Sequence, residues 1–191
     1  MKTVEPKFIV GIGGSAGALN AYKALLEAMP HDTGIAFVII SHMMPTAHSQ
    51  LTTILSRHTD MAVRLASDEM SILANHVYIM PPNTDITVEN YKLKLISPRT
   101  GRNKQVDLFF ISLAEAMGAR AVGIILSGYD GDGTLGCKHI KANGGKTFAQ
   151  DMSAEVGHMP LSAQEAGCVD FVLPLDKIPA KLISLASTLK I

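Results

Sequence analysis

The residues of this chain that could do chemistry follow three apolar runs. Ser15 lies in a glycine-rich turn after the first run, His42 follows the second run, and Asp130 and Asp132 follow the third. A serine hydroxyl becomes a nucleophile when an imidazole takes its proton, and a carboxylate beside the imidazole orients it and stabilises its charged form. These residue types together indicate a Ser-His-Asp triad, which is defined by the roles of its members and not by their order along the chain.

The turn that carries Ser15 fits two functional motifs and one structural role. Gly11, Gly13 and Ala16 have the spacing of a dinucleotide-binding fingerprint, whereas Gly13, Ser15 and Gly17 have the spacing of a nucleophile elbow. A nicotinamide site also needs an acidic residue about 20 residues further on. The second apolar run ends without one, which counts against a dinucleotide site. Ser15 could otherwise serve as the N-cap of the helix that follows.

The other candidate residues also have structural interpretations. His42 could be a structural histidine, and the Asp-Gly pairs at Asp130 and Asp132 could form a solvated turn. His42 and His48 stand six residues apart, a spacing that does not place two imidazoles on one helical face, and no cysteine or carboxylate cluster joins them. The Asp-Gly-Asp-Gly pattern lacks the further oxygen ligands of a calcium loop. We therefore expect no metal site.

Short apolar strands alternate with amphipathic helices and would position these residues. Strands are expected over 8–13, 35–41, 121–126, 147–149 and 169–173. Helices are expected over 18–29, 48–57, 106–117, 133–142 and 178–189. This alternation is typical of α/β domains, in which ligands bind beyond the carboxyl ends of parallel strands. Ser15, His42 and the two aspartates should therefore meet at one edge of the sheet.

The middle of the chain departs from this alternation. Strands are expected over 76–80, 85–88 and 92–96, with a hairpin turn at Glu89-Asn90-Tyr91. We interpret this region as an antiparallel insertion and not as a separate domain. The expected fold is α/β, a doubly wound, mostly parallel sheet with an antiparallel β-hairpin insertion at one edge, in a single domain over residues 1–191.

The composition excludes several classes of protein. Of the 191 residues, 47% are hydrophobic and 18% are charged, and 17 basic side chains balance 17 acidic ones. This excludes disorder and argues against a nucleic-acid binder. The apolar runs are far shorter than the roughly 18 residues that span a bilayer, and the N-terminus does not read as a signal peptide. Since Cys137 and Cys168 form no metal or redox motif, we expect reduced, buried thiols in a cytoplasmic protein without direct membrane insertion.

Seven ordered segments extend the pattern beyond these single residues. They are Ile12-Gly13-Gly14-Ser15-Ala16-Gly17, Ser41-His42-Met43, Val106-Asp107-Leu108-Phe109-Phe110, Leu126-Ser127-Gly128-Tyr129-Asp130-Gly131-Asp132-Gly133-Thr134-Leu135-Gly136, Ala149-Gln150-Asp151, His158-Met159-Pro160 and Gly167-Cys168-Val169-Asp170-Phe171-Val172-Leu173-Pro174. Together they resemble the catalytic domain of CheB, the chemotaxis receptor protein-glutamate methylesterase family. The resemblance covers nearly the whole chain, from about Phe8 to Leu189.

The resemblance implies an activity and a set of site residues. The activity is hydrolysis of glutamyl methyl esters on methyl-accepting chemotaxis receptors or similar methylated signalling proteins, with release of methanol and with glutamine deamidation as a related reaction. Ser15 falls on the family's nucleophile, His42 on its base and Asp132 on the third member of its triad. The backbone amides of Ala16 and Tyr129 fall on its oxyanion donors, and no cofactor is needed. The alternative is a non-catalytic signalling module that keeps the fold for partner binding.

Four features depart from the family's usual pattern. Only residues 1–7 precede the first expected strand, so we expect no N-terminal receiver domain and no control by phosphorylation in cis. Asp130 stands where the family usually has glycine, and a second negative charge near the oxyanion would oppose the transition state. Asn103-Lys104-Gln105 replaces Arg-Pro-Ser, which puts receptor contacts in question, and Ala18 replaces a common glycine at a helix start.

Overall fold

The main sheet of the protein has seven parallel strands. The computed structural model describes residues 4–42 and 50–188. Across the sheet the strands stand in the order β10 (Phe171–Leu173), β9 (Lys146–Gln150), β8 (Ala121–Ile125), β1 (Phe8–Gly14), β2 (Ile35–Ser41), β5 (His76–Ile79) and β3 (Ala62–Leu65). The chain therefore extends from β1 in both directions, toward β2 on one side and toward β8 on the other. In open α/β sheets, the carboxyl end of the strand at which the direction reverses, here β1, is the usual ligand position.

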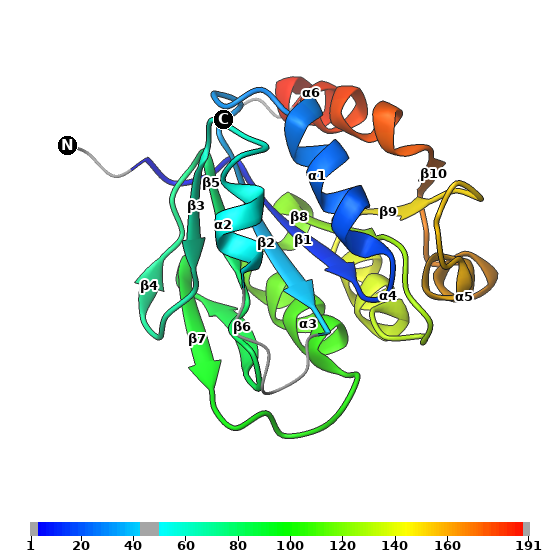
Figure 1. Ribbon diagram of the computed structural model, residues 1–191, viewed down its shortest axis with the longest axis horizontal. Coiled ribbons are helices and arrows are strands. Elements are labelled where there is room, and N and C mark those ends of the chain that lie inside the picture. Colours follow the sequence, from blue (N-terminus) through cyan, green and yellow to red (C-terminus); the bar gives the residue numbers. More distant parts are fainter. Residues whose placement is uncertain (1–3, 43–49, 189–191) are drawn as a thin grey trace.

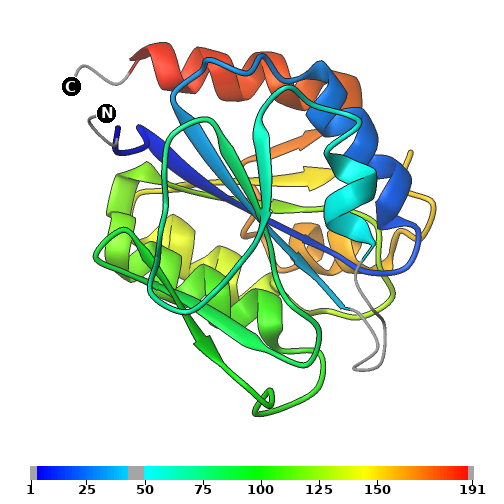
Figure 2. The ribbon, with the colours of Figure 1, turned by 60° about the vertical axis from the view of Figure 1, so that its left-hand side comes forward.

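Helices cover both faces of this sheet, which confirms the doubly wound architecture (Figures 1 and 2). One face carries α1 (Ala18–Ala28), α2 (Leu51–Leu55) and α6 (Ile178–Thr188). The other carries α3 (Gln105–Met117), α4 (Thr134–Ala142) and α5 (His158–Glu165), and two 3₁₀ turns occupy Gly118–Arg120 and Leu175–Lys177. Strand β2 serves both cores, since Phe37 and Ile39 pack under α1 while Val38 and Ile40 pack toward α3. None of the helices in the described ranges is long and apolar enough to cross a bilayer.

The predicted hairpin forms a second, smaller sheet. Strands β6 (Asp85–Glu89) and β7 (Lys92–Ile96) pair antiparallel, and β4 (Met70–Ser71) adds to the free side of β7. This sheet packs on α3, where the Ser112 hydroxyl accepts a hydrogen bond of 3.0 Å from the Val88 amide. The predicted place of β5 in this insertion is wrong, because β5 pairs parallel with β2 and β3 in the main sheet. Its residues Val77 to Ile79 are buried, as in a strand covered on both faces.

Other boundaries differ from the sequence expectations in smaller ways. β3, β4 and α5 were not expected as regular elements. Of the helix expected over 48–57, α2 occupies only Leu51–Leu55, and residues 48 and 49 lie outside the described residues, as does Leu189 at the end of the closing helix. Cys137 and Cys168 are buried free thiols, as expected.

Candidate active site

The register of the sheet places Ser15 and His42 next to each other. Gly14 is the partner of Ser41 in the parallel pairing of β1 with β2, so Ser15 and His42 are the first residues beyond two paired positions. The His42 amide donates to the Gly14 carbonyl at 3.3 Å, and the Ser15 amide donates to the Ser127 carbonyl beyond β8 at 2.9 Å. Three strand ends therefore meet at one edge, as the sequence predicted (Figure 1).

Ser15 does not cap the helix that follows it. The N-cap of α1 is Gly17, whose φ of 73° lies in the left-handed region, and no side chain makes a capping hydrogen bond there. Ser15 is half-buried in the turn. The Ser127 hydroxyl stabilises this turn by donating a hydrogen bond of 2.7 Å to the Ala16 carbonyl. The structural alternative of an N-cap serine is thereby wrong, and the hydroxyl is left for another role.

Asp132 joins the imidazole of His42 to the start of a helix. The Nε2 atom of His42 lies 2.6 Å from Oδ2 of Asp132. The same carboxylate accepts hydrogen bonds of 2.9 Å from the backbone amides of Val106 and Asp107, in the first turn of α3. Its side chain has no exposed surface. A buried carboxylate at a helix N-terminus is stabilised by those amides and by the helix dipole, which holds it firmly against the ring.

Asp107 reciprocates by holding the loop that carries Asp132. Its Oδ1 accepts hydrogen bonds from the amides of Gly133 at 3.0 Å and Gly136 at 2.8 Å, at the start of α4. Burial and the charge of Asp132 raise the pKa of Asp107, while the backbone amides oppose that shift. Sequence reasoning assigned no role to Asp107, although an acidic residue in the first turn of a predicted helix is a signal for amide contacts.

Asp130 contributes a second carboxylate to the same imidazole. Its Oδ2 lies 3.2 Å from Nδ1 of His42, and its Oδ1 accepts a 3.0 Å hydrogen bond from the Asp132 amide. Burial of the ring opposes protonation of His42, but the two carboxylates outweigh burial and raise its pKa from 6.5 to about 9. Asp130 is not among the residues with positive φ, so the turn does not require glycine at this position.

The two backbone amides expected as oxyanion donors belong to the residue after Ser15 and to a loop that passes close to Ser15 at Gly128. The Ala16 amide follows Ser15 directly, and the Tyr129 amide lies in the loop after β8. Neither amide donates a hydrogen bond to another residue in the described ranges. Gly128 makes this approach possible, because a Cβ at that position would stand 3.1 Å from the Ser15 Cβ and 2.5 Å from the Met159 sulfur. The Gly128 amide donates to the Val156 carbonyl at 2.9 Å, which fixes the loop.

The altered segment 103–105 includes a residue that is structural. Gln105 is only 1% exposed, and its Nε2 donates to Oδ1 of Asp85 at 2.9 Å and to the Gly101 carbonyl at 2.8 Å. Asp85 also accepts hydrogen bonds from Thr100. Position 105 therefore fastens the loop before α3 to the small sheet and does not present a side chain to a partner.

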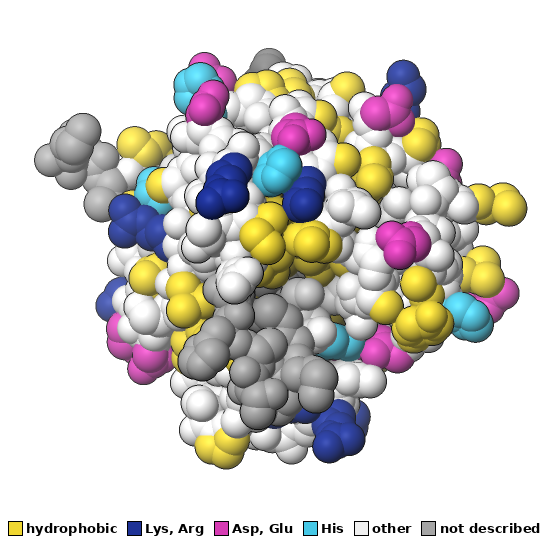
Figure 3. All heavy atoms as spheres, viewed as in Figure 1, with side chains coloured by type: hydrophobic (Ala, Val, Ile, Leu, Met, Phe, Trp, Pro, Cys, Tyr) yellow, Lys and Arg dark blue, Asp and Glu magenta, His cyan; other side chains and the backbone are white. Residues whose placement is uncertain are grey.

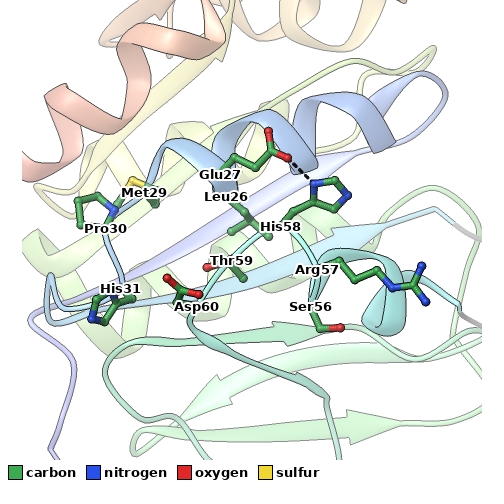
Figure 4. A pocket seen from close by; sticks show the side chains of 10 residues that line it. All are labelled: Leu26, Glu27, Met29, Pro30, His31, Ser56, Arg57, His58, Thr59 and Asp60. Atoms are coloured by element: carbon green, nitrogen blue, oxygen red, sulfur yellow. Dashed lines mark hydrogen bonds and ion pairs between the residues drawn. The ribbon is translucent and has the colours of Figure 1, made fainter.

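A separate polar hollow lies at the opposite edge of the sheet. It is lined by the end of α1 and by the segment that leads into β3, and includes Glu27 and His58, which pair at 2.5 Å (Figure 4). Because α1 ends there near the amino end of β2, this hollow is remote from Ser15. Within residues 4–42 and 50–188, no group of three or more His, Cys, Asp or Glu side chains is arranged to hold a metal ion. His48 lies outside these ranges.

This chain is similar to known proteins along most of its length. The CheB methylesterase family model matches residues 10–182. A protein-glutamate methylesterase/protein-glutamine glutaminase of Hydrogenovibrio crunogenus is 33% identical over 184 residues, which are 93% of this chain and 49% of that protein. A protein of Leptospira interrogans that is provisionally given the same name is 35% identical over 178 residues, which are 91% of this chain and 92% of that protein.

A solved structure extends the match to three dimensions. The crystal structure of the Thermotoga maritima CheB methylesterase catalytic domain superposes with a TM-score of 0.85 at 30% identity, covering 93% of this chain and 98% of that domain. The chain spans about half the length of the Hydrogenovibrio relative, but nearly all of the Leptospira one. By sequence and by fold, this chain belongs to the CheB methylesterase family.

Proposed function

We propose that this protein hydrolyses the methyl esters of glutamate side chains on methyl-accepting chemotaxis receptors, and that it also deamidates glutamine there. Ser15 is the nucleophile, His42 the base, and Asp132 the carboxylate that orients the base. The observation that carries this proposal is the β1–β2 register, which sets Ser15 beside His42 while Nε2 of His42 stands 2.6 Å from Asp132. The names of the relatives support the same chemistry.

The first half of the reaction forms an acyl-enzyme. Since Nε2 of His42 faces Asp132, Nδ1 is the nitrogen that takes the proton from the Ser15 hydroxyl as its oxygen attacks the ester carbonyl. The amides of Ala16 and Tyr129 donate to the oxyanion that forms. The carbon–methoxy bond then breaks, the imidazolium gives its proton to the methoxy oxygen, and methanol leaves.

The second half of the reaction regenerates the serine. A water molecule attacks the glutamyl ester of Ser15 and passes a proton to Nδ1 of His42, and the Ser15 oxygen leaves with that proton. The product is a free glutamate side chain. With glutamine as substrate, ammonia replaces methanol as the first leaving group and the second half is unchanged.

The surface beside the site suits a protein substrate. The Tyr129 side chain is 68% exposed, and its ring centroid stands 6.4 Å from that of His158 on α5. His158 also lines a hollow of about 400 Å³ that includes the exposed side chains of Met152 and Leu161. Figure 3 shows hydrophobic side chains at the surface over α5 and the neighbouring loops. Apolar groups exposed around a reactive edge are typical of a surface that binds another protein.

Methanol release from a purified methylated chemoreceptor tests the proposal. We expect release by the wild-type protein, and none by Ser15→Ala at equal concentration and with unchanged circular dichroism. Release by both proteins would remove Ser15 from the reaction. Release by neither, with several methylated receptors, would favour a non-catalytic signalling module.

A further inference from the structure

One imidazole stands between two carboxylates in this site. Asp132 approaches Nε2 of His42 at 2.6 Å and Asp130 approaches Nδ1 at 3.2 Å. The side chain of His42 is 8% exposed and that of Asp130 is 27% exposed, so solvent screens the second pair only in part. The two contacts differ in kind, because the Asp130 contact has the distance of an ion pair while Nδ1 has no hydrogen-bond partner within the described ranges.

We propose that Asp130 is a positioning residue that pairs with Nδ1 of His42, the nitrogen needed by Ser15, and so holds the enzyme in a low-activity form at neutral pH. This inference rests on the proposed function, since it concerns the base of the same reaction. A neutral imidazole has one N–H, which it donates to Asp132, whereas an imidazolium also presents a charged N–H at Nδ1, within ion-pair distance of Asp130. The geometry around His42 therefore favours the charged ring.

The position of the Asp130 carboxylate is set by its own turn. Its Oδ1 accepts the Asp132 amide at 3.0 Å, which leaves Oδ2 directed at the ring. Burial raises the pKa of Asp130, but the pairing with His42 and the hydrogen bond from the Asp132 amide lower it overall, which keeps this carboxylate ionised. Among the described residues, the ionisable groups that act on His42 are Asp130 and Asp132 from the loop after β8. Asp107 on α3 acts on Asp132 and not directly on the ring.

Asp130 thus competes with Ser15 for the same nitrogen. A charged His42 cannot accept the serine proton, and with a pKa of about 9 only about one ring in a hundred is neutral at pH 7. Removing the Asp130 charge should lower the pKa of His42 by roughly one to two pH units, the usual effect of one close opposite charge. The neutral fraction at pH 7 then rises by about tenfold or more. The rate rises less, by about threefold to tenfold, because a less basic imidazole is a weaker proton acceptor.

Asp130→Asn tests this with little change in shape. The Asn Oδ1 can still accept the Asp132 amide and keep the turn, while the charge is gone. Asp176→Asn is the matched control, because Asp176 is an exposed carboxylate in the 3₁₀ turn Leu175–Lys177 and its side chain pairs only with Lys177 among the described residues. The first readout is the pKa of His42, which is measured by an NMR titration of the full chain with ¹⁵N-labelled histidine. The His42 signals are assigned by their loss in His42→Gln.

The two readouts separate this proposal from the proposed function. We expect the His42 titration to move down by roughly one to two pH units in Asp130→Asn and not at all in Asp176→Asn. An unmoved titration in Asp130→Asn overturns the proposal whether or not the protein is an esterase. The second readout is the pH profile of methanol release, which should rise at pH 7 and fall or stay level above pH 9. A shifted titration with an unchanged profile overturns the link between Asp130 and activity, and a shifted titration in a protein that releases no methanol refutes the esterase function alone.

Discussion

Replacing Asp132 by Asn removes a charge that serves both the imidazole and a helix. The carboxylate accepts from Nε2 of His42 at 2.6 Å and from the amides of Val106 and Asp107 at 2.9 Å each. All three partners are donors, and an Asn side chain offers one oxygen and one NH₂ group, which also donates. Either the imidazole or an α3 amide therefore loses its acceptor in Asp132→Asn.

The structure separates the expected loss of stability from the loss of activity. Because the side chain is fully buried, losing one charged acceptor should lower the free energy of unfolding by about 1–3 kcal/mol. The activity loss should be far larger, on the order of 10⁴ in kcat, as when a triad aspartate is neutralised elsewhere. That factor corresponds to about 5.4 kcal/mol of transition-state stabilisation.

Asp107→Asn is the control for this substitution. Asp107 is likewise a carboxylate at a helix start, although only partly buried, and it accepts hydrogen bonds from the amides of Gly133 and Gly136, but it makes no contact with His42 within the described ranges. We expect a similar loss of stability in urea unfolding but less than about a tenfold loss of kcat in methanol release. If folded Asp107→Asn lost as much activity as Asp132→Asn, the effect of Asp132 would come from loop geometry and the imidazole pairing would be refuted.

Three more predictions concern pH, backbone and substrate. The folded pKa of His42 is raised from 6.5 to about 9, so the stability that this shift contributes is complete below pH 6.5 and is lost as the pH rises through 9. His42→Gln should therefore lower the free energy of unfolding more at pH 6 than above pH 9. Equal losses at the two pH values would contradict this. Gly133 has a φ of 94°, and a Cβ there would collide with Ile125. Gly133→Ala should therefore lower the free energy of unfolding, measured in urea, by roughly 2–4 kcal/mol. A variant as stable as the wild type would be inconsistent with that turn. The double variant Met152→Asp with Leu161→Asp should raise KM for methylated receptor about tenfold with little change in kcat, and an unchanged KM would place the docking surface elsewhere.

Sequence was sufficient for the strands that are buried on both faces. β1, β2 and β8 are continuous apolar runs, and their expected ends lie within one residue of those observed. β3 is mostly exposed and β4 has two residues, so neither has a hydrophobic pattern from which a strand can be predicted. β5 was expected as a strand but assigned to the wrong sheet, because an apolar run does not indicate which strand it pairs with. α5 was missed because it is short and contains Pro160, which is compatible only with a first helical turn.

The same limits apply to the site. Ser15, His42 and the pair Asp130 and Asp132 could be placed at one edge because each follows a buried strand and parallel strand ends share an edge. The choice of Asp132 over Asp130 came from the family resemblance. The hydrogen bonds from the amides of Gly133 and Gly136 to Asp107 join residues 26 and 29 positions apart, which no local pattern reports. Asp130 was expected to act on the oxyanion. The structure shows in addition that its carboxylate pairs with Nδ1 of His42, a contact that depends on the direction of one turn.

Trapping the acyl-enzyme is the most direct test of the proposed chemistry. Methylated receptor would be mixed with the protein, quenched in acid within the first turnover, and digested for mass spectrometry. We expect a glutamyl ester on the peptide that contains Ser15 in the wild type, and none in His42→Ala. A glutamyl ester on another residue, or methanol release with no ester on Ser15, would contradict the account.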